Sequence, residues 1–317
     1  MGQTEQIKQK ALDLGFDLVG ITDAAPLHLD YINRLLGWLD AGYAGSMTWM
    51  HQNLEKRIDP AKLLPGAQSV ICVGLGYKPP DTPDARDGSR DGKKGRVAAY
   101  ASYEDYHPFI KKHLRLLVDF IVSRTGPGLK FKICVDSTPL LERAFAVRAG
   151  LGFIGKNHAL VNPRLGPQIF LGELITNLPL VSDKPVPESC PNCNQCVSAC
   201  PTGALRPDGF LDATKCISYL TIESNAEIPS DLAPKIGNRL FGCAECLLAC
   251  PCQHKAPPRA NEAFVFYPDR THLDLNEVLN LTENQFQVKY ADSPLLRPGL
   301  RHIKHVAEIC LKNMSSS

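Results

Sequence analysis

The sequence predicts a mixed α/β (α+β) domain over residues 1–182, a cysteine module over residues 183–262 and a short helical tail over residues 263–317. Three observations support this division. Strand-like and helix-like segments alternate in the first 182 residues. Nine of the 12 cysteines crowd into residues 190–252. Helical patterning returns after residue 272.

In the first domain, short apolar runs predict strands and repeats at helical spacing predict helices. The expected strands are residues 16–22, 67–77, 96–102 and 129–136, followed by two strands across a turn within residues 158–177. The expected helices are residues 4–14, 107–124 and 137–150, and residues 28–56 are helix-rich. In residues 107–124 the apolar positions are Ile110, Leu114, Leu117, Val118 and Ile121. Ser137 or Thr138 is the expected N-cap of the 137–150 helix, and Gly150 its stop.

Composition excludes some classes of protein and leaves others open. A chain of 317 residues with 44% hydrophobic residues can bury a sizeable core, and its net charge of +2 decides nothing about polyanionic partners. No apolar run approaches the roughly 20 residues that span a bilayer. The N-terminus lacks the basic start and apolar block of a secretory signal. We therefore expect a cytoplasmic protein without membrane contact.

Two further segments have simple interpretations. Residues 79–96 are rich in Pro, Gly and charge, which indicates a long surface loop. Cys72, Cys134 and Cys310 stand alone in apolar surroundings and are expected to be small buried hydrophobes.

The other nine cysteines have the spacing of a metal module. Cys190, Cys193, Cys196 and Cys200 precede a proline, Cys243, Cys246 and Cys250 repeat the same ending, and Cys216 lies between the two runs. In ferredoxins with two clusters, the fourth cysteine of such a run binds the other cluster. Applied here, this crossing predicts two 4Fe-4S clusters in a ferredoxin-like module. The ligand sets are Cys190, Cys193, Cys196 and Cys250 for one cluster, and Cys200, Cys216, Cys243 and Cys246 for the other.

The alternative is a pair of tetrahedral zinc sites, which normally present separated Cys-x2-Cys pairs. A reducing compartment favours metal binding over disulfides. The other eight cysteines occupy all ligand positions of the two clusters, so Cys252 is expected to be a thiol that binds no iron. Clusters pass single electrons but select no substrate, so an electron carrier, a redox enzyme with a further cofactor and a structural module all remain open.

The first domain carries no Gly-x-Gly-x-x-Gly fingerprint after a strand. Its densest polar group begins at Asp136, at the end of a predicted strand, and continues through Glu142 and Arg143 to Lys156 and Asn157. Glycines 150, 152 and 155 permit close approach of a bulky ligand. The alternative is a strand-capping aspartate and a glycine-rich turn.

At these residues the chain resembles the epoxyqueuosine reductase family, which is related to the reductive dehalogenases. The resemblance rests on "VDSTPLLERAFAVRAGLGFIGKN", "FLGELIT", "CISYLTIE", "RIDPAKLLPGAQSVICVGLGY" and "YEDYH", in family order over roughly residues 1–262. It implies a cobalamin-binding catalytic domain over residues 1–182. It also implies reduction of epoxyqueuosine to queuosine at the wobble position of a tRNA anticodon.

The resemblance assigns roles to individual residues. The family's proton donor matches Asp136, and burial beside a corrin is expected to raise its pKa toward neutrality. Arg57 matches a family arginine near the cofactor, with a solvated helix-end charge as the alternative. Arg143, Lys156, Asn157 and Ser218 are further expected cobalamin contacts. Asp105, Tyr106 and His107 match the family's DYH motif, with a capping aspartate and packed aromatics as the alternative.

The chain also departs from the family. Ala99 stands where many relatives have an arginine, and only about 50 residues follow the module where relatives continue into HEAT-like repeats. Arg297, Arg301, Lys304 and Lys312 make the tail basic, which suits either a phosphate-facing surface or a solvated helix face. We expect a monomer fed by an external low-potential electron donor. A corrinoid reductase acting on a small molecule and a ferredoxin-type electron carrier are the alternatives.

Overall fold

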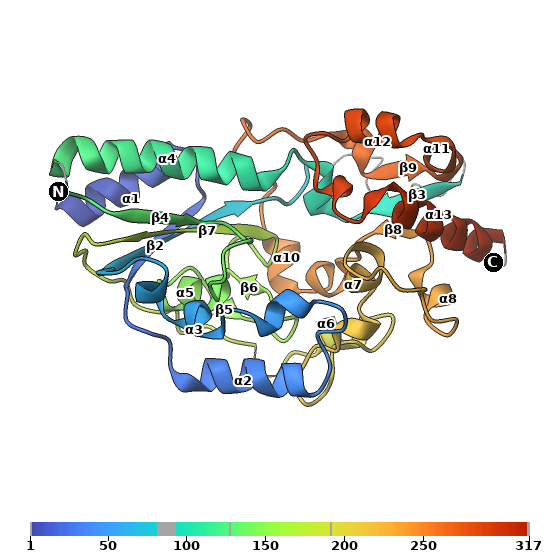
Figure 1. The fold of residues 1–317 in the computed structure, drawn as a ribbon, viewed down its shortest axis with the longest axis horizontal. Coiled ribbons are helices and arrows are strands. Elements are labelled where there is room, and N and C mark those ends of the chain that lie inside the picture. The colour runs from blue at the N-terminus through green and yellow to red at the C-terminus, as the bar shows by residue number, and fades with distance from the viewer. Residues whose placement is uncertain (1, 81–92, 127, 191, 316–317) are drawn as a thin grey trace.

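The computed structural model describes residues 2–80, 93–126, 128–190 and 192–315 (Figure 1). The α-helices are α1 (Gln3–Asp13), α2 (Leu29–Asp40), α3 (Leu54–Ile58), α4 (Tyr106–Thr125), α5 (Glu142–Arg148), α6 (Gln195–Ser198), α7 (Ile217–Ile222), α8 (Ala233–Ile236), α9 (Glu245–Leu248), α10 (Pro251–Lys255), α11 (Leu275–Asn280), α12 (Glu283–Lys289) and α13 (Gly299–Ser315). The strands are β1 (Leu18–Asp23), β2 (Ser69–Gly76), β3 (Lys94–Val97), β4 (Phe131–Cys134), β5 (Phe153–Ile154), β6 (Leu160–Val161), β7 (Ile169–Thr176), β8 (Arg239–Phe241) and β9 (His272–Asp274). The predicted loop at residues 79–96 falls largely on 81–92, outside the described residues.

A four-stranded antiparallel sheet in the order β1-β2-β7-β4 forms the centre of the first domain. Helices α1 and α4 cover one face, and α5 and α3 lie on the other (Figure 1). Every residue of β2 is buried because both faces are covered. Ile71 and Val73 pack under α1 and α4, whereas Val70 and Cys72 join the core beneath α5. The mixed α/β prediction is confirmed for this domain.

Helix α4 buries the apolar positions that its sequence pattern predicted. Its five predicted apolar positions are all buried, and they belong to the core between the helix and the sheet. Asp105 caps the helix by accepting a hydrogen bond from the His107 backbone N–H, at 2.9 Å. The cap fixes where the helix starts and thereby places the His107 side chain at the end of the sheet.

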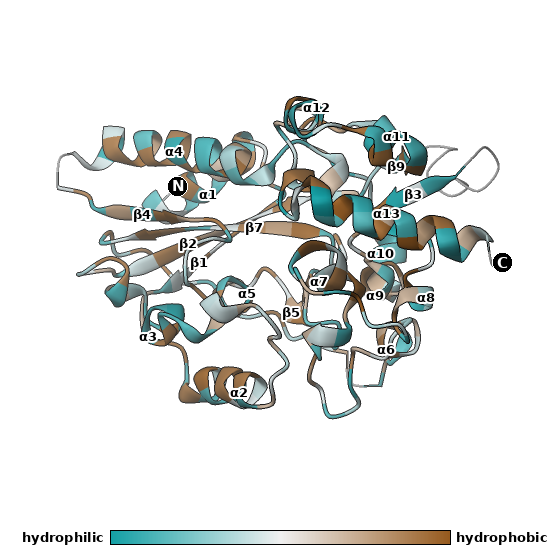
Figure 2. Cartoon of the chain, turned by 45° about the vertical axis from the view of Figure 1, so that its right-hand side comes forward, coloured by the Kyte–Doolittle hydropathy of each residue, from teal (hydrophilic) through white to brown (hydrophobic). Residues whose placement is uncertain are grey.

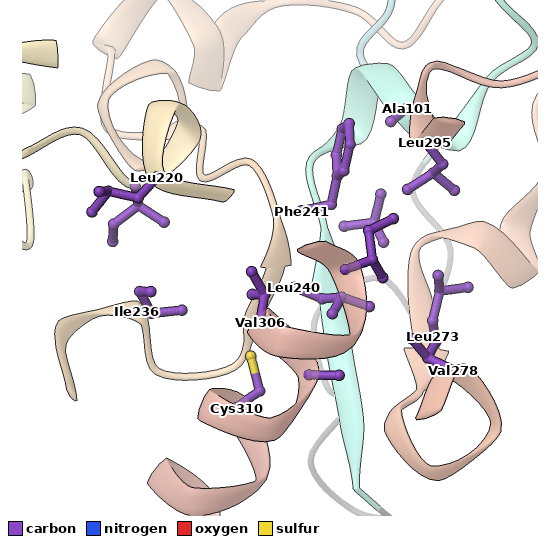
Figure 3. Packing of buried hydrophobic residues seen from close by; sticks show 14 of the residues in the cluster. Ala101, Leu220, Ile236, Leu240, Phe241, Leu273, Val278, Leu295, Val306 and Cys310 are labelled. Carbon is purple, nitrogen blue, oxygen red and sulfur yellow. The ribbon is translucent and has the colours of Figure 1, made fainter. Parts of the chain in front are cut away.

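A second sheet, in the order β8-β3-β9, joins three distant parts of the chain. Helix α13 packs on β8, and Val306 and Cys310 of α13 lie with Leu240 and Phe241 in one buried cluster (Figure 3). Figure 2 shows both hydrophobic (brown) and hydrophilic (teal) parts on α13, and its buried residues are mostly apolar. The tail is therefore part of the core that supports the cysteine module. Cys72, Cys134 and Cys310 are fully buried, as expected.

Two element predictions were wrong in part because turns replace regular structure. The predicted 96–102 strand ends at Val97 and continues as a 3₁₀ turn over Ala99–Ser102, because its partner strand β8 ends at Phe241. The predicted 137–150 helix begins only at Glu142. Neither Ser137 nor Thr138 is its N-cap, because residues 136–141 are bent, irregular backbone and Leu141 is the N-cap residue. The Leu141 N–H donates to the carbonyl of the distant Arg57. The predicted stop at Gly150, with φ +80°, is confirmed.

Two other predictions held in outline. The two strands expected within residues 158–177 exist, but β6 pairs with β5 and β7 joins the central sheet. The expected helical tail is present after residue 274, whereas residues 272–274 form β9 on the edge of β3. None of the helices in the described ranges is both long and apolar enough to cross a bilayer.

Candidate functional site

Asp136 lies two residues beyond the C-terminal end of β4, at one end of the central sheet. Its backbone has φ +55°, a left-handed conformation that aspartate tolerates better than most residues. Its N–H donates to Oε1 of Glu142, at 2.6 Å. The side chain is 61% exposed. The turn therefore projects a carboxylate out of a buried sheet.

His107 joins this carboxylate to a second one. Its Nδ1 atom lies 2.7 Å from Oδ1 of Asp105, and its Nε2 atom lies 3.0 Å from Oδ2 of Asp136. Burial by itself would lower the pKa of His107, but hydrogen bonds to both carboxylates outweigh it and raise that pKa to about 9. Asp105 is thus a helix-capping residue, as the alternative interpretation of this motif predicted. His107 in addition contacts Asp136.

The structure shows a lowered pKa for Asp136, whereas the raised pKa expected beside a corrin stays a prediction. The hydrogen bond from His107 lowers the pKa of Asp136 and outweighs its partial burial. At neutral pH the proton of this pair therefore resides on His107. Tyr106 stacks on the His107 ring with centroids 4.0 Å apart, and also on Phe170, which holds the imidazole in place.

Arg57 lies behind the Asp136 turn. It is 9% exposed, so the alternative of a solvated helix-end charge does not hold. Its Nη2 atom donates to the Trp49 carbonyl at 2.9 Å, and its own carbonyl accepts from Leu141. Burial lowers the pKa of Arg57. In the structure, Arg57 ties the segment around Trp49 to the turn that carries Asp136.

The three glycines of the 150–157 segment serve packing within the chain. A Cβ atom at Gly150 would meet the Lys184 carbonyl oxygen at 2.6 Å, and one at Gly152 would meet the Val161 carbonyl oxygen at 2.4 Å. A Cβ atom at Gly155 would lie 2.7 Å from Oδ1 of Asn157. The three glycines are therefore explained by a tightly packed turn and not by the approach of a bulky ligand.

Lys156 and Asn157 connect this turn to the cysteine module. The Lys156 Nζ atom donates to Oδ1 of Asn194 at 2.8 Å. Asn157 is buried, and its side-chain amide donates to the Cys246 carbonyl at 3.3 Å. Arg143 is exposed and donates to the carbonyl of the neighbouring His158, at 2.6 Å.

The first predicted ligand set lines one cavity of about 300 Å³, together with Gly155, Lys156 and Asn157. Its cysteines are Cys190, Cys193, Cys196, Cys250 and the additional Cys252. Four thiols around a space of this size are a donor set suited to a 4Fe-4S cluster. Cys252 is half-buried beside Cys250 and offers a fifth thiol.

The second predicted set also converges. Cys200, Cys216 and Cys243 are the groups whose charges act most directly on the Cys246 thiol. Cys216 is the N-cap residue of α7, and Ser218 and Tyr219 follow it in the first turn of that helix. Burial raises the pKa of the Cys216 thiol. In the structure Ser218 therefore lies beside the second cysteine set.

A larger cavity of about 520 Å³ borders the second set at Cys243. Arg96, Ala99 and His272 also line it. Ala99, the residue that departs from the family arginine, therefore lies on the side of the second cysteine set.

One residue that acts on Asp136 comes from outside its own segment and was not predicted for this site. Arg297, which precedes α13, donates to Oε2 of Glu223 at 3.0 Å and lies over the Trp49 ring. Its charge acts on Asp136 and on Tyr100. The sequence marked Arg297 only as one of several basic tail residues, because nothing local indicates that the tail folds back to this turn.

Cobalamin is too large to be enclosed in either the 300 Å³ or the 520 Å³ cavity. It would therefore have to bind at an exposed surface. Arg143 acts electrostatically on Asp136 and donates to His158, whose neighbour Asn157 lines the first cysteine cavity. These polar groups would suit hydrogen bonds to the amide-bearing rim of a corrin, which would supply two-electron chemistry there.

The comparisons with known proteins agree with this site. Residues 57–137 match the family model described as "Epoxyqueuosine reductase QueG, DUF1730", and residues 189–253 match a "4Fe-4S double cluster binding domain". An epoxyqueuosine reductase of Pseudomonas aeruginosa is 40% identical over 93% of this chain and 81% of its own length.

Solved structures agree over the whole chain. A crystal structure of an epoxyqueuosine reductase with an epoxyqueuosine-modified tRNA-Tyr stem loop is 32% identical, with a TM-score of 0.91, covering 99% of this chain and 82% of that one. The Bacillus subtilis enzyme, solved with its catalytic loop swung out of the active site, is 30% identical, with a TM-score of 0.89 and the same coverage.

The prediction of iron–sulfur clusters over zinc is thereby confirmed, and the cofactors are two 4Fe-4S clusters and cobalamin. The chain is an oxidoreductase that belongs to the epoxyqueuosine reductase family.

Proposed function

We propose that this chain reduces epoxyqueuosine to queuosine at the wobble position of a tRNA anticodon. One observation carries the proposal: an exposed Asp136 carboxylate is paired with His107, in a chain whose four predicted ligands of one cluster line a single cavity. Family membership supports the reaction, and the relative solved with a modified tRNA stem loop supports tRNA as the partner.

The reaction defines what the chain must supply. Removing the epoxide oxygen as water leaves a carbon–carbon double bond and consumes two electrons and two protons. Cobalamin, when bound, supplies two-electron chemistry that single clusters lack. The protein must hold the substrate, deliver electrons one at a time and place a proton at the departing oxygen.

Asp136 is the proposed catalytic residue, and His107 the proposed source of its proton. In the resting state the proton resides on Nε2 of His107, 3.0 Å from Oδ2 of Asp136. Transfer to that carboxylate makes Asp136 the acid that faces the substrate. As the carbon–oxygen bond breaks, an O–H bond forms on the departing oxygen, and Asp136 returns to its ionised state. Asp105 stabilises the imidazolium from the opposite side.

The electron path is proposed to follow the two cysteine sets. Cys200, Cys216, Cys243 and Cys246 would hold the cluster that accepts electrons from an external low-potential donor. Cys190, Cys193, Cys196 and Cys250 would hold the cluster that supplies electrons to cobalamin. The proposed cobalamin contacts are Arg57, Asp136, Arg143, Lys156, Asn157 and Ser218.

We propose that residues 1–182 bind cobalamin, that residues 183–262 transfer electrons and that residues 263–317 support the other two parts. The tail has a direct role in this scheme because it brings Arg297 to the catalytic turn. We propose that the chain works as a monomer in the cytoplasm.

The test uses purified chain loaded with iron, sulfide and cobalamin, and supplied with a low-potential chemical reductant. Asp136→Asn should retain corrin absorbance and lower the reduction of epoxyqueuosine in tRNA by about 10²–10⁴-fold, the range for loss of a general acid. Asp208→Asn, on an exposed turn of the cysteine module, is the matched control. Nucleoside mass spectrometry of the digested tRNA measures the product.

Three results contradict the proposal in different ways. Full turnover by Asp136→Asn removes this residue from its role. Retained corrin without reduction of the tRNA substrate favours a corrinoid reductase of small molecules. Failure of the loaded chain to retain corrin favours an electron carrier.

A further inference from the structure

Glu173 is a charged residue type in the middle of the central sheet. It lies on β7, opposite Cys72 of β2 and Cys134 of β4, and its exposure is 0%. Neither carboxyl oxygen meets a hydrogen-bond donor among the described residues. A lone ionised carboxylate in such a place is very unfavourable, so the group must be neutral or share a proton.

Glu142 reaches the same point from the start of α5. Its carboxyl group is a direct electrostatic neighbour of the Glu173 carboxyl group, and its Oε1 atom accepts the Asp136 backbone N–H, at 2.6 Å. Two ionised carboxylates that close together in an apolar core would repel each other, so one of them must carry a proton. Glu142 thus lies beside a buried acid on one side and is bonded to the catalytic turn on the other.

The groups that face the pair include no ion-pair partner for it. The α5 residues Arg143 and Arg148 lie nearby, but Arg143 donates to His158, and Arg148 is bonded to Thr22 and Asp23. The remaining titratable neighbours carry no positive charge: Asp136, Tyr106 of α4, Cys72 of β2 and Cys134 of β4. Across the described ranges, neither glutamate has a Lys, Arg or His nitrogen at ion-pair distance.

The electrostatics agree with this geometry. Burial raises the pKa of Glu173 well above its usual range, and the neighbouring Glu142 adds to the effect. Burial also raises the pKa of Glu142, to about 7. Such a pair titrates as one unit, and it holds one proton in neutral solution.

We propose that Glu142 and Glu173 share one proton, and that the protonated pair positions the Asp136 turn with its carboxylate toward His107. This inference rests on the proposed function for its link to turnover. Neither glutamate touches the substrate in this scheme, because both act through the Asp136 backbone. The left-handed Asp136 conformation is held at its N–H by Glu142 and at its side chain by His107.

Loss of the shared proton would place two like charges in an apolar core without a cation. Glu142 would then move away from Glu173, and the Asp136 N–H would lose its acceptor. Turnover should therefore fall as pH rises far enough to remove the last proton of the glutamate pair, and this step should be separate from the one due to His107.

The experiment compares Glu173→Gln, Glu142→Gln and Glu142→Leu with the parent holoenzyme and with the surface control Glu277→Gln. In Glu173→Gln the amide replaces the shared proton with a permanent N–H donor to Glu142. The step of the pH profile of kcat that belongs to the glutamate pair should disappear, and the step that belongs to His107 should remain. Glu142→Gln keeps an acceptor for Asp136, whereas Glu142→Leu removes it and should lower kcat by roughly tenfold with little change in KM.

Infrared spectroscopy tests the proton directly and needs no turnover. The parent protein and the Glu277→Gln control should show the carbonyl stretch of a protonated carboxyl group at pH 7. Glu173→Gln should lose it, because Glu142 alone ionises once the amide donates to it.

Absence of that band from the parent protein at pH 7 would overturn the proposal, as would identical pH profiles for the parent and Glu173→Gln. If the parent protein shows the band but fails to reduce tRNA, the proposed function falls and the proton sharing stands. Should Glu142→Leu fail to fold, the two glutamine variants still decide the outcome.

Discussion

Nε2 of His107 lies 3.0 Å from Oδ2 of Asp136, although the two residues are 29 positions apart and belong to different elements. His107 is in the first turn of α4, and Asp136 follows β4. The contact moves the proton of the site from the carboxyl group to the imidazole. It therefore decides which group stores the proton before turnover.

The role of His107 can be tested by substitution. His107→Gln should keep a hydrogen bond to Asp136 but remove the proton store, and we expect turnover to fall by about 10²-fold or more. The upper limb of the pH profile, which we assign to the His107 pKa of about 9, should vanish. Steady-state rates between pH 6 and 10 measure both effects. An unchanged upper limb in His107→Gln would assign that limb to another group.

The same histidine should make stability depend on pH in the alkaline range. Its pKa is raised from 6.5 to about 9 in the folded chain. The folded state therefore binds more protons than the unfolded state in this window. The resulting stabilisation is fully present below pH 6.5 and is lost as pH rises through about 9. The thermal unfolding midpoint of Asp105→Asn should fall less steeply over this window than that of the parent protein.

The glutamate pair predicts a second window at lower pH. The pKa of Glu142 is raised from 4.5 to about 7, so folding again takes up protons between these values. The contribution of the pair to stability therefore declines as pH rises from about 4.5 to 7. Glu173→Gln should flatten this decline, which calorimetry from pH 4.5 to 8 can measure. A decline as steep as that of the parent protein would argue against a raised pKa in the pair.

The crossed assignment of the cysteines predicts which cluster each substitution removes. Cys250→Ser should lose the cluster bound with Cys190, Cys193 and Cys196, and Cys243→Ser should lose the other. In each case iron content should drop from about eight atoms per chain to about four. Cys252→Ser is the matched control, since its thiol lies in the first cavity but is not a predicted ligand. Electron paramagnetic resonance of the reduced variants identifies the remaining cluster.

Loss of cluster signal in Cys252→Ser, with full signal in Cys250→Ser, would exchange the roles of these two thiols.

The glycine-rich turn predicts a stability effect without a direct cofactor effect. A Cβ atom at Gly152 would lie 2.4 Å from the Val161 carbonyl oxygen, so Gly152→Ala should destabilise the chain by about 1–3 kcal/mol through overpacking. Gly37→Ala, in the exposed interior of α2 with nothing within 4 Å, should instead stabilise by about 0.5–1 kcal/mol. Chemical denaturation of both variants measures the difference. Equal stabilities of Gly152→Ala and Gly37→Ala would contradict the prediction, because they would mean that the backbone around residue 152 moves to accommodate the added Cβ atom.

The sequence by itself determined features whose cause is local. Cysteine spacing predicted which thiols converge, because three thiols within one short loop can reach only a shared centre. Helical periodicity predicted the buried face of α4, and an apolar run predicted β2. The end of a strand pattern placed Asp136 at the edge of the sheet.

Only the tertiary structure decided the chemistry of the carboxyl groups. The direction of the Asp136 pKa shift depends on His107, and the buried proton depends on Glu173 meeting Glu142. The approach of Arg297 depends on the tail folding back over the module. These partners are distant in the chain. A pKa depends on burial and on charges a few ångströms away, and sequence spacing fixes neither of them.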